Sequence, residues 1–308
     1  SLHPMIQEIT LSETKPSVSS CHTLLDSLQH ICLMHGMEVD YYKKLFQTIG
    51  NIIELIEKDD MPKYLLFLEN AFPYMDNYNY HKGMKGIIQE LKVLLKTKSI
   101  GTNSDRALLL DFQATLETKP EKAIKLEKDA LAQIENITAD NARLVSNLHA
   151  NLGGLYRMNG HPDLAREHME KSISLLDQFN LLHINDSIPQ IANYAMFLTE
   201  QQEPERGISE LQKLSGIIKE YHSDECLDYA KVQETLATIY LMTANLSQAK
   251  THLKKAFKIY ASSKVISLSG TQFSFGFPLL NMIIQNHLYK VGNIDLFLRL
   301  TVHDFHAQ

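Results

Sequence analysis

Apolar residues recur along most of this chain at the three- and four-residue spacing of helices that bury one face. In the stretch NLGGLYRMNG, Leu152, Leu155 and Tyr156 follow that spacing, and the segments YLLFLENAF and GMKGIIQELKVLL show it further upstream. The pattern therefore predicts helices. Gly153 and Gly154 interrupt one of them, and each glycine inside a helix costs about 1 kcal/mol relative to alanine, so this pair needs an explanation.

The helical pattern also repeats every 42 residues. Steps of 42 give four equivalent places near the end of an apolar segment, at Ala114, Tyr156, Leu198 and Tyr240. Nine residues later each unit has a small residue, at Ala123, Ala165, Gly207 and Ala249. Four registers that agree without a gap indicate an internal repeat, which is the sequence signature of solenoid proteins.

Each repeat reads as two helices joined by a turn. The turn sequences are TKPE, GHPD, QEPE and ANLS, and a proline, serine or acidic residue near the start of the second helix is a typical initiation signal. Such a hairpin cannot bury its apolar face alone, so neighbouring hairpins must stack. The sequence predicts an all-α, right-handed superhelical solenoid of antiparallel helix pairs.

Four regions follow from this pattern. Residues 104–263 hold the four 42-residue repeats, and residues 21–103 read as degenerate helical repeats that include a tyrosine-rich linker, PYMDNYNY. Residues 1–20 are interpreted as a tail or as the end of a preceding region. Residues 264–308 are interpreted as an irregular segment followed by a capping helix pair.

The repeat resembles the tetratricopeptide repeat. That family has Leu, Gly, Tyr, Gly, Ala and Ala at the places occupied here by Leu152, Gly153, Tyr156, Gly160, Ala165 and Ser172. The family period is about 34 residues, whereas the longer period here is similar to the kinesin-light-chain type, and no Trp is present near the start of the first helix. The resemblance implies a superhelix that binds a protein or peptide ligand in its concave groove.

The two adjacent glycines then have different roles. Gly153 is expected on the packing face, close to the second helix of its hairpin, because alanines occupy the same place in the next two repeats. Gly154 is expected to face the groove, where larger residues stand in the other repeats. Its lack of a side chain would let a ligand approach the helix backbone. The alternative is a tolerated defect.

Asparagines are the strongest sequence signal for binding. Asn151 and Asn193 lie 42 residues apart, at the expected groove edge of successive first helices, and Thr235 is the third member of this series. An asparagine amide can both donate to and accept from a peptide backbone. The alternative is an asparagine that is solvated or bonded between helices. The candidate ligand-binding residues are Asn147, Asn151, Gly154, Arg157, Asn193, Met196 and Thr235.

A second signal lies at the start of the chain, in SLHPMIQE. This string, followed by helical repeats, resembles the end of the winged-helix region in bacterial signalling ATPases of the STAND class with NB-ARC cores. The resemblance implies that His3 contacts the nucleotide of a nucleotide-binding domain in the same chain. The alternative is an arbitrary N-terminal tail.

Composition narrows the classes of function. The chain has 308 residues, of which 44% are hydrophobic and 21% charged, with a net charge of -6. It has no basic block, which disfavours nucleic acid as a partner, and no apolar run long enough for a membrane span. The N-terminal sequence does not read as a secretion signal, and three cysteines without a CxxC pair fit a cytoplasmic protein.

Signatures of an enzyme or a cofactor site are missing from the sequence. There is no phosphate-binding GxxxxGK[ST], HExxH or GxSxG motif and no paired-cysteine zinc pattern, so we expect no cofactor. His303 and His306 near the C-terminus are a weak metal candidate. The cysteines are interpreted as core residues. The tyrosines of the linker form either an aromatic binding patch or a packed loop.

Taken together, the sequence predicts a non-enzymatic protein or peptide recognition module, read as the ligand-sensing part of a larger STAND-type ATPase. The alternative is a stand-alone peptide-sensing regulator of the kind found in Gram-positive bacteria. A scaffold without switching also fits. An apolar terminal hairpin, residues 279–300, could either cap the array or mediate homo-oligomerisation.

Overall fold

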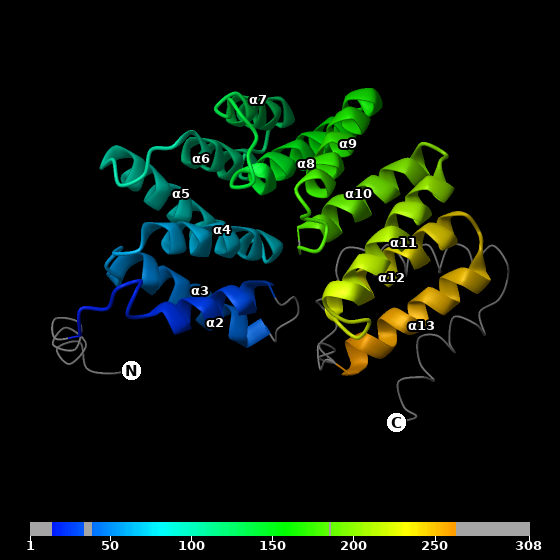
Figure 1. Cartoon of the computed structure of the whole chain (residues 1–308), viewed down its shortest axis with the longest axis horizontal. Helices are drawn as coiled ribbons and strands as arrows, with labels where there is room; N and C mark the ends of the chain where they lie inside the picture. Colours follow the sequence, from blue (N-terminus) through cyan, green and yellow to red (C-terminus); the bar gives the residue numbers. More distant parts are fainter. Residues whose placement is uncertain (1–13, 34–38, 185, 263–308) are drawn as a thin grey trace. The chain divides into compact units, whose positions relative to one another are not determined.

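The computed structural model describes residues 14–33, 39–184 and 186–262. These residues form twelve α-helices and no strand (Figure 1), which confirms the predicted all-α fold of antiparallel helix pairs. The chain divides into two compact units, Ser1–Phe179 and Asn180–Gln308, and each is described by itself. No helix in the described part of the chain is long and apolar enough to cross a membrane.

Unit 1 contains eight of the described helices, and its last three hairpins are α4–α5, α6–α7 and α8–α9 (Figure 1). The helices are α2 (His22–Leu33), α3 (Val39–Leu55), α4 (Met61–Asn77), α5 (His81–Lys96), α6 (Asn103–Thr115), α7 (Pro120–Leu131), α8 (Ala142–Met158) and α9 (Pro162–Gln178). Unit 2 contains two hairpins in its described part. They are built from α10 (Ser187–Glu200), α11 (Pro204–Tyr221), α12 (Leu227–Met242) and α13 (Leu246–Ser262).

The 42-residue period fixes where helices begin and end. The second helices begin at Pro120, Pro162, Pro204 and Leu246, and the three prolines are in the first turn, where a missing N–H costs nothing. The turn before three of them has one left-handed residue, at Gly160, Gln202 and Ala244. In each case the next residue donates its N–H to the carbonyl of the residue five places earlier, which is the hydrogen bond of a Schellman motif.

Small residues bring the two helices of each hairpin together, as the repeat predicts. Ala123, Ala165, Gly207 and Ala249 are all buried. Gly153 confirms the packing interpretation, because a Cβ added there would lie 2.6 Å from the Cγ of Met169. A Cβ added at Gly154 would meet nothing within 4 Å, so packing does not require that glycine.

The tyrosine-rich segment differs from its prediction as a linker. Helix α4 continues through Pro73 to Asn77. Pro73 removes one helical hydrogen bond, but Tyr74 and Met75 are buried on the face that also buries Phe67 and Ala71, and this packing outweighs the loss. Helix propensity is a weak prior that tertiary contacts override.

The aromatic side chains of this segment are packed, so the packed-loop alternative is the better description. Phe46 of α3 stacks on Tyr80 with ring centroids 4.5 Å apart, and it meets Tyr74 and Tyr78 edge-on. Tyr74 is 1% exposed. The cluster joins α3 to the hairpin α4–α5, and it belongs to the core of unit 1.

Candidate binding site

The first helices of three successive hairpins meet along one face of unit 1. Arg143 of α8 donates to Asn70 of α4 across 3.3 Å and lies 3.8 Å from the Glu69 carboxylate. Asn151 of α8 donates its amide to Asp111 of α6 across 2.8 Å. We call this surface, defined by Glu69, Asn70, Asp111, Arg143 and Asn151, the first-helix face.

The Asn151 amide is held by an unusual pair of buried acids. Asp111 is 8% exposed and Glu127 of α7 is 2% exposed. Within the repeat they occupy the places of Gly153 and Met169, or of Ala195 and Leu211 one repeat later. A slot filled elsewhere by a small and a large apolar residue therefore holds two carboxyls here.

Burial dominates the electrostatics of this pair. It raises the pKa of the Asp111 carboxyl, while hydrogen bonds with Glu127 and Asn151 hold the rise back. Burial also raises the pKa of Glu127, and repulsion from Asp111 raises it further. One oxygen of Glu127 has no hydrogen-bond partner. Because two adjacent carboxylates cannot both be charged at low cost in a buried site, the pair retains a proton near neutrality.

The structure places four of the predicted binding residues on α8. Asn147 and Arg157 are half-buried, Asn151 is exposed, and Gly154 opens onto empty space. Asn147, Asn151 and Gly154 follow one another at four and three residues, so they form one line along the helix. The interhelical bond of Asn151 was one of the alternatives from the sequence. The Asn151 side chain also hydrogen-bonds Glu127, and the residue as a whole remains exposed.

The remaining predicted residues lie in unit 2. Asn193 is exposed and Met196 is half-buried, both on α10, whereas the Thr235 hydroxyl donates to the carbonyl of Lys231 in its own helix, across 3.0 Å. Thr238, the counterpart of Gly154, is buried rather than open. Because Asn151 belongs to unit 1, the series that links it to Asn193 stays a prediction. His3, His303 and His306 lie outside the described residues.

Unit 2 has an open pocket at a place that sequence reasoning did not find. Its volume is about 450 Å³, and it lies between α11 and the end of α12. The lining residues are Glu205, Ile208, Ser209, Gln212, Tyr240, Thr243 and Asn245. None of the residues predicted for binding contributes to it.

A second missed feature is a polar clasp inside two of the hairpins. In α8–α9, the Nδ1 atoms of His149 and His168 are 2.9 Å apart, and the His168 ring stacks on Tyr156. In α12–α13, Gln233 Oε1 lies 2.8 Å from His252 Nδ1, and the His252 ring stacks on Tyr240. The three positions recur 84 residues apart, a spacing that the sequence contains.

Partial burial lowers the pKa of the clasp histidines and so favours their neutral form. Desolvation lowers the pKa of His149 to about 4, with a smaller effect from the neighbouring His168. Burial likewise lowers the pKa of His168 and of His252. One neutral imidazole donates and the other accepts in the first clasp. The described residues contain no group of three or more His, Cys, Asp or Glu side chains suited to hold a metal ion.

The prediction that the cysteines are core residues is wrong for Cys226. Its side chain is half-exposed, and its sulfur accepts the backbone N–H of Tyr229 at the start of α12, across 3.4 Å. It therefore caps a helix. Cys21 is partly buried against the core of unit 1, as expected.

Comparisons with known proteins support the fold. A family model for the tetratricopeptide repeat matches residues 187–262. The apo form of RapI is 14% identical, with a TM-score of 0.53, over 91% of this chain and 72% of that one. A Rap protein complexed with Competence and Sporulation Factor is also 14% identical, with a TM-score of 0.51, over 90% and 74% of the two chains.

A putative kinesin light chain of Podosopora anserina, with nearly identical TPR-like repeats, is 14% identical over 67% of this chain and 98% of its own, with a TM-score of 0.49. At such low identities a likeness shows the fold alone. No curated protein matches the sequence. The matched repeat and the fold are those of a TPR-type helical repeat protein.

Proposed function

We propose that this chain is a protein or peptide recognition module and that the first-helix face of unit 1 binds the ligand. The observation that carries the proposal is the position of Asn151. Its amide is anchored on the buried Asp111, while the residue as a whole remains exposed. An amide fixed in this way can pair with the backbone of an extended peptide without first losing side-chain freedom.

The neighbours of Asn151 on α8 extend this site. Gly154 leaves room for a peptide backbone beside the helix. Asn147 supplies a second amide one turn earlier, and Arg157 supplies a cation for an acidic group of the ligand. In unit 2, Asn193, Met196 and Thr235 are proposed to contact ligand as well. One Rap structure of this fold class is a complex with Competence and Sporulation Factor, which supports a binding role.

The wider context rests on the resemblance of SLHPMIQE to STAND-type ATPases. In this proposal, ligand binding to the repeats shifts a linked nucleotide-binding domain from its resting state toward assembly, which requires different ligand affinities in the two states. His3 would contact the nucleotide. The Rap-like fold favours the alternative, a stand-alone cytoplasmic regulator that binds a peptide and changes its affinity for another protein.

The binding site can be tested with peptides selected from a random display library against the whole chain. Gly154→Gln fills the open space beside Asn151, and we expect it to reduce the affinity of the selected peptides at least about tenfold, a loss of about 1.4 kcal/mol. Gly216→Gln on α11 is the matched control, because a Cβ there also meets nothing. Equal affinity of both variants would place the ligand elsewhere.

The wider context has its own test. An antibody raised against the chain would detect the native protein in its source cells. A band near 35 kDa, the mass of this chain, supports the stand-alone regulator. A band larger by a nucleotide-binding domain supports the ATPase, and ligand-dependent nucleotide hydrolysis by that protein would then be measured.

A further inference from the structure

Helix α5, the second helix of its hairpin, has an exposed face whose charged side chains are all lysines. Lys82, Lys85, Lys92 and Lys96 are exposed on α5, and Lys98 follows directly after it. We call these five residues the α5 lysine stripe. Residues 81–98 contain five lysines and one glutamate, a net charge of +4 in a chain of net charge -6. The lysines are too widely spaced to read as a basic block in the sequence.

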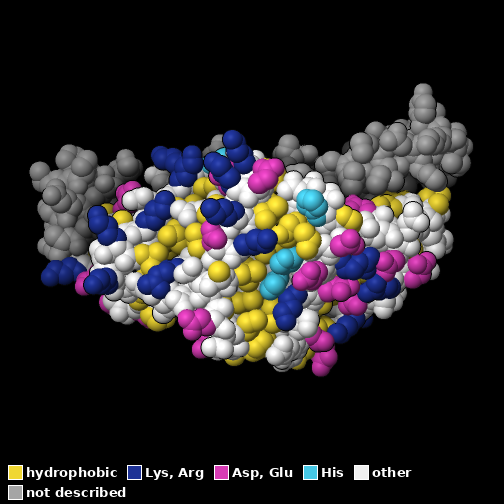
Figure 2. Space-filling view, turned by 90° about the horizontal axis from the view of Figure 1, so that it is seen from above, with side chains coloured by type: hydrophobic (Ala, Val, Ile, Leu, Met, Phe, Trp, Pro, Cys, Tyr) yellow, Lys and Arg dark blue, Asp and Glu magenta, His cyan; other side chains and the backbone are white. Residues whose placement is uncertain are grey.

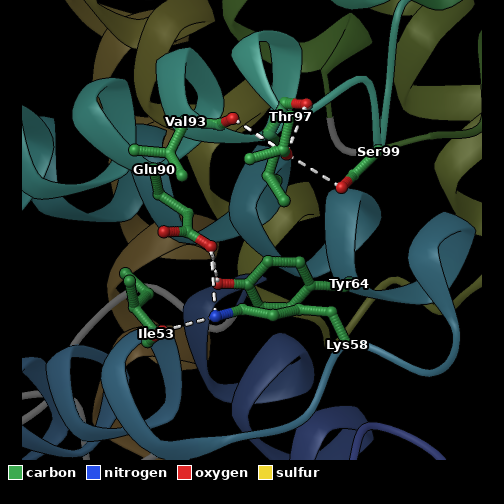
Figure 3. A network of polar contacts seen from close by, with 8 residues as sticks. Ile53, Lys58, Tyr64, Glu90, Val93, Thr97 and Ser99 are labelled. Carbon is green, nitrogen blue, oxygen red and sulfur yellow. Dashed lines mark hydrogen bonds and ion pairs between the residues drawn. The ribbon is translucent and has the colours of Figure 1, made fainter.

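The glutamate of α5 does not neutralise the stripe, because it faces the interior of unit 1. Glu90 accepts a hydrogen bond from the Tyr64 hydroxyl across 3.1 Å and pairs with Lys58 across 3.3 Å (Figure 3). Burial raises the pKa of Tyr64, so its hydroxyl stays a donor. Lys58 also donates to the carbonyl of Ile53. The Oε1 atom of Glu90 is therefore held by both Tyr64 and Lys58 beneath the stripe.

Among the described residues, no acidic side chain outside α5 pairs with the stripe. None of its five lysines forms an ion pair with another described residue. Figure 2 shows Lys and Arg side chains gathered on the part of the surface that covers α5 to α7. On α7 the exposed lysines alternate with Glu121 and Asp129, so α5 is the less neutralised helix.

The stripe has the geometry of a helix-binding face. Its α5 residues, together with Gly86, Gln89 and Val93, recur at intervals of three and four residues, so they share one side of the helix. From Lys82 to Lys96 this side is about 21 Å long. Gly86 has open space above it, and Val93 is 42% exposed, which leaves a small apolar strip between the charges.

We infer that the α5 lysine stripe docks an acidic helical segment of a partner protein. A second helix that lies along α5 presents carboxylates with the same spacing of three and four residues, so each lysine meets an acid. Gly86 permits close approach, and Val93 gives the partner helix one apolar contact. This face belongs to a second helix, so the inference does not depend on the site proposed around Asn151.

Charge argues against the other polyanions. A duplex nucleic acid or an anionic bilayer extends beyond one helix and would also meet the rest of a chain with 36 acidic side chains. A short acidic helix needs only one such face. Helix α13 also carries four lysines and no acid, and α5 is distinguished from it by Gly86 and the exposed Val93 between its lysines. The chain itself offers no such segment at its C-terminus, because residues 263–308 contain three basic and two acidic residues.

The test is a fluorescence anisotropy titration with a stapled 20-residue helix that carries glutamates at this spacing. Binding to the whole chain should weaken about tenfold between about 20 and about 150 mM salt, because exposed charges are screened. Lys85→Gln, Lys92→Gln and Lys96→Gln together should reduce affinity at least about tenfold. Circular dichroism checks that this variant is folded, and charge reversal to glutamate should abolish binding.

Two controls make the result decisive. Lys250→Gln, Lys254→Gln and Lys258→Gln remove as many exposed charges from α13 and should leave the affinity within about twofold, since rim charges act locally. A stapled helix of equal charge with its glutamates spread around the helix should bind at least about threefold more weakly. Equal loss from both triple variants would overturn the inference, as would equal binding of both helices, or tight binding only of duplex DNA or phosphatidylserine vesicles.

Discussion

The hairpins α6–α7 and α8–α9 have the same backbone architecture but fill one equivalent slot with opposite chemistry. In α8–α9 the slot holds Gly153 against Met169. In α6–α7 it holds Asp111 and Glu127, both buried. The comparison shows that the repeat specifies the closeness of the two helices and leaves the chemistry of the contact open. The departure coincides with the anchored amide of Asn151, the residue on which the proposed binding site depends.

The largest effect is expected from filling the apolar slot. In Gly153→Leu the new side chain would overlap Met169 and come within 3.3 Å of the Ala165 carbonyl oxygen, so we expect the free energy of unfolding to fall by about 3 kcal/mol. Urea denaturation monitored by circular dichroism measures it. Gly154→Ala is the control and should stabilise by up to about 1 kcal/mol. Equal effects of the two changes would contradict the assignment of Gly153 to packing.

A somewhat smaller effect is expected when the acidic slot is made apolar. Asp111→Ala with Glu127→Leu reproduces the pair found at Ala195 and Leu211. Replacing buried charged groups with apolar residues of similar size is often stabilising, so we expect a gain of about 2 kcal/mol at pH 8. The midpoint of urea unfolding measures it. A loss of stability would show that the carboxyl pair stabilises the fold, which would contradict our interpretation that it costs stability.

The two slots should also differ in their response to pH. Burial raises the pKa of both Asp111 and Glu127 above their unfolded values, so the folded state binds more protons and stability falls as pH rises. The stabilising effect of these protons is complete below the ordinary carboxyl range and is lost through the raised pKa values. We expect the wild type to lose at least about 1.4 kcal/mol relative to the double variant between pH 5 and pH 8.

Subtracting the double variant separates this effect from the clasp histidines. The lowered pKa of His149 destabilises the fold only as pH decreases, and both proteins share that change. Urea unfolding at several pH values provides the measurement. Parallel curves for the two proteins would show that Asp111 and Glu127 titrate normally.

The smallest effect concerns the left-handed turn residue of the hairpins α8–α9, α10–α11 and α12–α13, which α6–α7 does not have. Ala244 has φ 60° and Gln202 has φ 66°, at places equivalent to Gly160. Because L-residues are strained in this region and glycine is not, Ala244→Gly should stabilise by about 0.5–1 kcal/mol. Gly160→Ala should destabilise by a similar amount. Thermal unfolding compares the two, and changes of the same sign would contradict the assignment.

Much of the fold follows from the sequence because its signals are local. The prolines that start α7, α9 and α11 and the small residues at the helix crossings are visible as a 42-residue period. Pro73 was misread because its cost is local, whereas the packing of Tyr74 and Met75 that overrides it comes from residues distant in sequence. The division into two units at Phe179 leaves no sequence signal of this kind.

The candidate site was only partly predictable. The exposed place of Asn151 follows from the repeat register, and Asp111 could have been found in the same register, as an acid where glycine and alanine stand elsewhere. Its partner Glu127 could have been found in the same way. The pKa shifts of the pair could not, because they depend on desolvation in three dimensions. The sequence shows the lysines of α5, but only the structure shows that Glu90 faces inward and leaves them without an acid on their side of the helix.

The polar clasps have a consequence for synthesis in the cell. Each joins residues only 19 apart in sequence, so closing it requires little loss of chain entropy. Loops of this size close in well under a millisecond, while a ribosome adds only about 5–20 residues per second. Each of these two hairpins can therefore lock soon after its second helix leaves the exit tunnel, before the segment that follows it has been made. These hairpins would then form in the order in which they are synthesised.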